Sequence, residues 1–142
     1  MNHRGTEDTE KRDRENAMND ERDPVTQEFI GAAIEVHRLM GPGLLESVYQ
    51  RCLEKELKLR GLSFIPQARL PLSYKGEPLG EDMIMDFYLP EKLIVELKAV
   101  DKLVPIHDAQ LITYLRLSRT HAGLLVNFNV PLLKDGIKRL VV

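Results

Sequence analysis

Two ionisable residues interrupt a stretch that otherwise has the character of a buried strand. The run from Leu93 to Val100 reads LIVELKAV, so Glu96 and Lys98 lie among aliphatic neighbours. Side chains alternate between the two faces of a strand, and these two charged groups therefore share one face. Burying ionised groups is costly unless they are paired or bind a metal. The run predicts a strand whose charged residues face a catalytic cleft.

A third charged residue, Asp86, lies in the preceding run MIMDFYLP. Alternation along a strand puts Asp86 on the face opposite Met85 and Phe87. The connection to the next run is short, which makes the two strands antiparallel neighbours. We therefore expect the carboxyl groups of Asp86 and Glu96 to meet across the strand pair.

Two carboxylates held together repel each other unless a cation lies between them. Mg²⁺, or similarly Mn²⁺, prefers oxygen ligands and keeps several waters, so Asp86 and Glu96 suit such an ion. Lys98 is placed to orient or deprotonate a water on the cation, or to neutralise charge on a phosphate under attack. The alternative is a surface ion pair beside an unrelated aspartate.

Two helical pairs of polar residues accompany this triad. Gln110 and Tyr114 are four residues apart, and Glu46 and Tyr49 are three apart, so each pair stacks on one face of its helix. Tyr49 also belongs to an apolar stripe, and packing in the core explains it at least as well as a role in a site.

Hydrophobic periodicity predicts the elements that position these residues. Helices are expected from Pro24 to the glycine turn at 41–43, from Leu45 to Gly61 and over 106–117, and strands over 64–74, 79–89, 93–100, 123–128 and 137–142. The predicted order is α-α-β-β-β-α-β-β, in which the first three strands form a meander.

Composition divides the chain into a tail and a body. Residues 1–23 hold five basic and eight acidic residues with almost no apolar ones, which is typical of a disordered segment. Residues 24–142 are expected to form one domain, with fifteen basic against fourteen acidic residues. Because this body is nearly neutral, any binding of nucleic acid must depend on a local patch.

The cysteine count and the hydropathy limit the compartment. Cys52 is the single cysteine, so an intrachain disulfide is impossible and the reducing cytoplasm is the expected location. No apolar run approaches the length of a membrane span, and we expect neither a signal peptide nor a membrane partner. Exposed sheet edges in so small a body favour a homodimer.

The stretch from Gly43 to Tyr49 reads GLLESVY, which resembles the signature of the bacterial GxxExxY proteins, a family similar to the PD-(D/E)XK nuclease superfamily. The resemblance covers about 25–142. The superfamily's active-site motifs are matched in the same order by Asp86, by Glu96-Leu97-Lys98 and by the Q-x-x-x-Y element of Gln110 and Tyr114. One departure is Met85, which stands where the superfamily has its proline.

The resemblance implies a restriction-endonuclease-like core of the α/β (α+β) class, with a mixed β-sheet flanked by helices. It implies that Asp86 and Glu96 ligate the metal and that Lys98 is the catalytic lysine. Glu46 would reach the metal directly or through water. Gln110 and Tyr114 would help to bind DNA or to arrange the site.

The first functional hypothesis is a Mg²⁺- or Mn²⁺-dependent nuclease acting on nucleic acid, most simply DNA. The second is a non-catalytic module that uses the same fold to bind nucleic acid or a protein partner. The third is hydrolysis of another phosphate ester by the same residues. Metal binding that depends on Asp86 and Glu96 separates the first from the second.

Overall fold

The computed structural model describes residues 23–142, and nearly all of the expected tail at 1–23 lies outside this range. The elements are α2 (Pro24–Met40), α3 (Glu46–Leu59), β1 (Ile65–Tyr74), β2 (Glu77–Leu89), β3 (Leu93–Lys98), α4 (Pro105–Ser118), β4 (Ala122–Asn127), the 3-10 helix η1 (Leu133–Gly136) and β5 (Ile137–Val141). The predicted order α-α-β-β-β-α-β-β is confirmed, with η1 as an addition.

The sheet contains five strands in the order β1-β2-β3-β4-β5. Neighbouring strands are antiparallel except β3 and β4, which are parallel. A parallel pair needs a long crossover, and α4 supplies it. The result is the mixed sheet expected of a restriction-endonuclease-like core.

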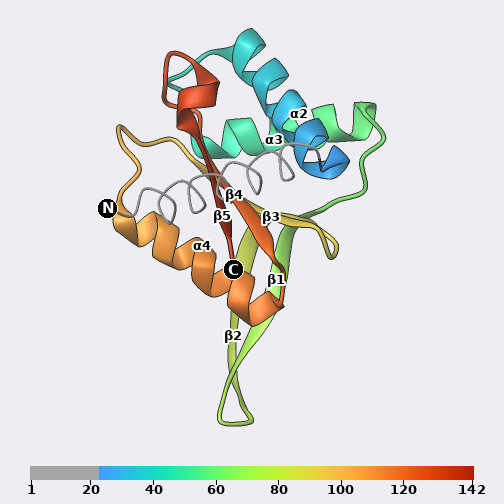
Figure 1. The fold of residues 1–142 in the computed structure, drawn as a ribbon, viewed down its shortest axis with the longest axis vertical. Coiled ribbons are helices and arrows are strands. Elements are labelled where there is room, and N and C mark those ends of the chain that lie inside the picture. Colours follow the sequence, from blue (N-terminus) through green and yellow to red (C-terminus); the bar gives the residue numbers. More distant parts are fainter. Residues whose placement is uncertain (1–22) are drawn as a thin grey trace, which may run out of the picture.

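Helices cover both faces of the sheet (Figure 1). Val95 and Leu97 of β3 pack in the cluster formed with α2 and α3, whereas Ile94 packs with Leu111 and Leu115 of α4. This alternation explains why the β3 sequence is apolar on both faces. Among residues 23–142, no helix is long and apolar enough to cross a membrane.

The hairpin of β1 and β2 extends beyond the helices (Figure 1). Tyr74 pairs with Glu77, so the turn contains only Lys75 and Gly76, whose φ values are 50° and 82°. The sequence prediction placed a longer turn here and began the second strand at Leu79. The two-residue turn has the positive φ values that match the twist of paired strands, so pairing continues further than expected.

One predicted face assignment is wrong. Met85 packs in the cluster on the α4 side of the sheet, whereas Phe87 packs in the cluster with α2 and α3. The paired strand is irregular at the same level, because Gln67 has a φ of 48° between two regularly paired residues. Simple alternation therefore does not hold through Asp86, which lies between Met85 and Phe87.

β1 and β5 form the two edges of the sheet. Pro66 and Pro71 lie in β1 and cannot donate ladder hydrogen bonds, which limits pairing of this edge with another strand. The homodimer expected from open edges stays a prediction.

Candidate active site

The carboxyl groups of Asp86 and Glu96 lie together at the point where regular pairing of β2 with β3 ends. The regular register ends at the pair Phe87 and Val95, and Asp86 and Glu96 are the next opposing residues. The backbone N–H of Asp86 donates to Oε1 of Glu96 at 3.2 Å, and the N–H of Leu97 donates to Oδ2 of Asp86 at 2.8 Å. Side-chain oxygens thus take the place of backbone carbonyls between the two strands. The carboxyl groups lie close enough together for Asp86 to raise the pKa of Glu96.

Glu96 lies in an environment that disfavours its charge. Its relative exposure is 6%, although it is a carboxylic acid in the centre of a sheet. Burial, followed by the charge of Asp86, raises the pKa of Glu96 to about 9, while Lys98 acts in the opposite direction. One ammonium group does not offset this pair of carboxyl groups, so a further cation would stabilise their ionised forms.

Glu46, the first residue of α3, lies near the same site. Burial and the charge of Asp86 raise the pKa of Glu46, whereas Lys98 lowers it. These electrostatic interactions require the side chains to lie near one another. Asp86, Glu96, Lys98 and Glu46 therefore converge from β2, β3 and α3.

The start of α3 is fixed by Tyr49. Its hydroxyl group donates to the carbonyl of Gly41 at 2.6 Å and accepts from the N–H of Leu44 at 3.1 Å. The ring is fully buried and stacks on Phe128 with centroids 4.3 Å apart. The sequence left open whether Tyr49 packs in the core or has a role in the site, and the structure favours packing. Tyr49 holds the loop that leads to Glu46.

Tyr114 of α4 lies within electrostatic range of the carboxyl groups of Glu96 and Asp86. Burial, then the charge of Glu96, raises the pKa of the Tyr114 hydroxyl group, and the charge of Asp86 adds to this shift. Gln110 is exposed, and its Nε2 donates to the Tyr114 hydroxyl oxygen at 3.0 Å. The expected Gln110 and Tyr114 pair is therefore formed.

Two glutamines that the sequence analysis missed hold Asp86. Nε2 of Gln50 donates to the backbone carbonyl of Asp86 at 3.1 Å, and Nε2 of Gln67 donates to its Oδ1 at 3.1 Å. Both line a cavity of about 450 Å³ together with Glu46, Ser47, Arg51 and Asp86. Gln50 follows Glu46 by four residues on one helix face, a spacing that would have revealed it.

Asn127 is a further residue without a sequence signal. It is 2% exposed and lies opposite Lys98 in the register of β3 and β4. Its Nδ2 donates to the carbonyl of Val100 at 2.9 Å, and the N–H of Val100 donates to its Oδ1 at 3.1 Å. Asn127 thus fixes the chain immediately after Lys98.

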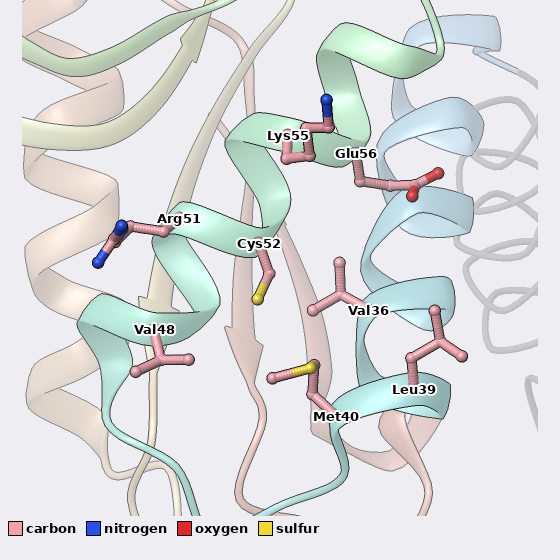
Figure 2. A pocket seen from close by; sticks show the side chains of 8 residues that line it. All are labelled: Val36, Leu39, Met40, Val48, Arg51, Cys52, Lys55 and Glu56. Atoms are coloured by element: carbon pink, nitrogen blue, oxygen red, sulfur yellow. The ribbon is translucent and has the colours of Figure 1, made fainter.

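A second hollow, of about 480 Å³, lies between α2 and α3 and differs in chemistry (Figure 2). Cys52 of α3 faces Val36 and Met40 of α2 there, and Arg51 borders the hollow. No carboxyl group of the Asp86 and Glu96 site lines it. Its mainly apolar lining separates it from the polar cavity at Asp86.

A comparison with models of protein families matches residues 23–140 to the PD-(D/E)XK nuclease superfamily. The chain belongs to this superfamily. Comparisons with curated proteins and with solved structures gave no match. The match is to the superfamily as a whole, so the closer resemblance to GxxExxY proteins stays a prediction.

Nucleases of the PD-(D/E)XK superfamily generally use divalent metal ions. Within residues 23–142, no cluster of three or more His, Cys, Asp or Glu side chains is already arranged to hold one. The adjacent pair of Asp86 and Glu96 nevertheless fits a hard cation, because all its donors are oxygens and Mg²⁺ commonly takes only one or two protein carboxylates. The role expected of Glu46, as a third ligand or through water, stays a prediction.

Proposed function

We propose that the protein is a metal-dependent nuclease that hydrolyses phosphodiester bonds of nucleic acid, most simply of DNA. The observation that carries this proposal is the contact of Glu96 with Asp86, which lines a cavity together with Glu46. Lys98 lies within electrostatic range of both glutamates. Membership of the nuclease superfamily supports the same reaction class.

In this proposal Asp86 and Glu96 hold Mg²⁺ or Mn²⁺ with their carboxylate oxygens, and Glu46 assists from α3. When bound, the ion supplies Lewis-acid polarisation of the phosphate and a more acidic water. Asp86 is well suited to ligation because Leu97 and Gln67 already fix its carboxylate while free lone pairs remain.

Lys98 supplies positive charge next to the carboxylates. Its ammonium group would stabilise the negative charge that builds on the phosphate oxygens during attack. Tyr114 and Gln110 would contact the nucleic acid backbone from α4, because the hydrogen bond between them orients both side chains toward one region. Asn127 would help to keep Lys98 in place by holding Val100, two residues further along the chain.

Basic residues on α3 support nucleic acid as the substrate. Arg51, Lys55 and Lys58 are exposed at helical spacing, and none of them forms an ion pair with another residue in the range 23–142. They line a hollow of about 330 Å³ with Glu54, while Arg51 also lines the cavity at Asp86. A strand of phosphates leaving the carboxylate site would meet these cations in succession.

The test is a cleavage assay on double-stranded DNA, single-stranded DNA and RNA, with Mg²⁺, with Mn²⁺ and with EDTA. We expect cleavage of at least one substrate that requires the metal. Asp86→Asn and Lys98→Ala should each lower the rate by about 100-fold or more, since each removes charge from the reacting centre.

Two matched controls lie nearby, one in β2 and one in the turn between β2 and β3. Asp82→Asn removes an exposed carboxylate from β2, and Lys92→Ala removes an exposed cation from the turn before β3. Both variants should keep the activity of the unmodified protein. Metal-independent cleavage, or cleavage that survives Asp86→Asn, would contradict the proposal.

The same assay separates the alternatives. A non-catalytic module would bind DNA or RNA in a gel-shift experiment without cleaving it under any metal condition. Hydrolysis of another phosphate ester would appear only in a parallel panel of nucleotides and small phosphoesters.

A further inference from the structure

Gln67 has a backbone conformation that its position in the fold does not explain. Four non-glycine residues in the described chain have positive φ: Gln67 (48°), Lys75 (50°), Glu91 (66°) and Arg119 (57°). The last three lie in the two strand-to-strand turns and at the end of α4, where positive φ is common. Gln67 instead lies inside β1. A strained residue within a strand persists only where the surroundings hold it there, and such residues gather at functional sites.

The strain at Gln67 occurs directly opposite Asp86. Pro66 pairs with Phe87 and Ala68 pairs with Met85, so Gln67 is the residue of β1 that faces Asp86. Its side chain is exposed, yet its Nε2 donates to Oδ1 of Asp86 at 3.1 Å. The unusual backbone thus accompanies a hydrogen bond to a residue of the carboxylate site.

Gln67 completes the restraint of the Asp86 carboxylate. Leu97 of β3 donates its N–H to Oδ2, and Gln67 of β1 donates to Oδ1. One oxygen is therefore held from each neighbouring strand, which restricts rotation of the carboxylate. A carboxylate has about four lone-pair positions, so ligand capacity remains.

We propose that Gln67 is a positioning residue that orients the Asp86 carboxylate for binding a divalent cation. This inference rests on the proposed function. The exposed side chain of Gln67 buries little surface, and its left-handed backbone lowers the stability of the fold. Its contribution is therefore to the geometry of the site and not to the stability of the protein. A structural residue would show the opposite balance.

Two substitutions separate the amide from the strain. Gln67→Gly removes both, because glycine adopts positive φ freely, whereas Gln67→Leu removes the amide and keeps the strain. We expect both variants to weaken Mn²⁺ binding, measured by calorimetry, and to lower kcat by about 10- to 100-fold, as is usual for residues that orient metal ligands. KM should change much less. Tm should be equal or higher in Gln67→Gly.

The matched control is Lys75→Gly, which relieves the same kind of strain at the hairpin turn. It should raise or preserve Tm and leave kcat and Mn²⁺ affinity unchanged. Metal affinity and kcat that stay unchanged in both Gln67 variants would overturn the proposal. Loss of activity that only follows a lowered Tm would also overturn it, since that result indicates a structural role.

The contact itself can be measured without any activity. In an NMR spectrum the side-chain amide signals of Gln67 should shift on Asp86→Ala and stay in place on Asp82→Ala. If the unmodified protein neither binds Mn²⁺ nor cleaves nucleic acid, the proposed function fails. The positioning contact is then judged by these amide signals, and an absent shift overturns it.

Discussion

Glu96 is a buried carboxyl group that lowers the stability of the fold but provides an oxygen ligand at the candidate site. Its neighbours Val95 and Leu97 are fully buried, and an aliphatic residue in its place would extend the core. Instead a carboxyl group is held against Asp86, where the two groups repel each other if both are ionised. The raised pKa of Glu96 keeps it protonated near neutral pH, and a cation bound between the two groups would instead stabilise both carboxylates.

We predict that the metal-free protein loses stability as pH rises between about 5 and 9. The pKa of Glu96 is raised from 4.5 to about 9 in the folded state, so within this window the folded protein holds a proton that the unfolded chain has released. Stability is therefore present below the lower value and falls as pH approaches the upper one.

The measurement is Tm against pH in EDTA for the unmodified protein and for Glu96→Gln. The variant should show a flatter profile and a higher Tm at pH 8, because its amide carries no charge. Adding Mg²⁺ should stabilise the unmodified protein more at pH 8 than at pH 6. Parallel profiles for the two proteins would contradict this explanation.

At the scale of elements, the site depends on where α3 begins. Glu46 is its first residue, and no side chain caps the helix at Leu45. The loop before it is held by the buried hydroxyl group of Tyr49, which contacts Gly41 and Leu44. The position of Glu46 thus depends on a tyrosine that is itself buried in the core.

Tyr49→Phe should destabilise the protein by about 1–2 kcal/mol, because the N–H of Leu44 and the carbonyl of Gly41 lose a partner. Denaturant unfolding with urea measures this change. Tyr74→Phe is the control: its side chain is 65% exposed at the hairpin turn, and the change should stay within about 0.5 kcal/mol. Equal effects of the two substitutions would show that the Tyr49 hydroxyl group does not hold the loop.

The order of the elements and the meeting of Asp86 with Glu96 could be predicted from the sequence, because both follow from periodicity and short connections. The face of Met85 could not, since alternation assumes a regular strand and β1 is irregular at Gln67. Positive φ at a glutamine has no signature in the residue type. Asn127 was missed for a different reason: its contact with Val100 joins segments that are 27 residues apart in the chain.

The net charge of the protein does not favour binding of nucleic acid. The chain holds 20 basic and 22 acidic residues, and its net charge is −2. Contact with phosphates must therefore come from local cations such as those of Arg51, Lys55 and Lys58. Because these cations are exposed on α3, substitutions there should alter the affinity for nucleic acid without changing the fold.

Lys55→Ala and Lys58→Ala should each weaken binding to DNA of any sequence and reduce the slope of log K against log salt concentration by about 1. Fluorescence anisotropy across a salt series, with Ca²⁺ in place of Mg²⁺, measures this slope. Lys92→Ala serves as the control and should leave the slope unchanged. Identical slopes for all three variants would remove α3 from the binding surface.

We propose that one divalent cation binds between the carboxylates of Asp86 and Glu96, which contact each other across β2 and β3. The decisive experiment is anomalous diffraction from crystals grown with Mn²⁺ and measured near the manganese absorption edge. We predict an anomalous peak in contact with carboxylate oxygens of both residues, which disappears in Asp86→Asn. If well-ordered crystals in saturating Mn²⁺ show no peak there, or show the peak at other residues, Asp86 and Glu96 do not form the metal site.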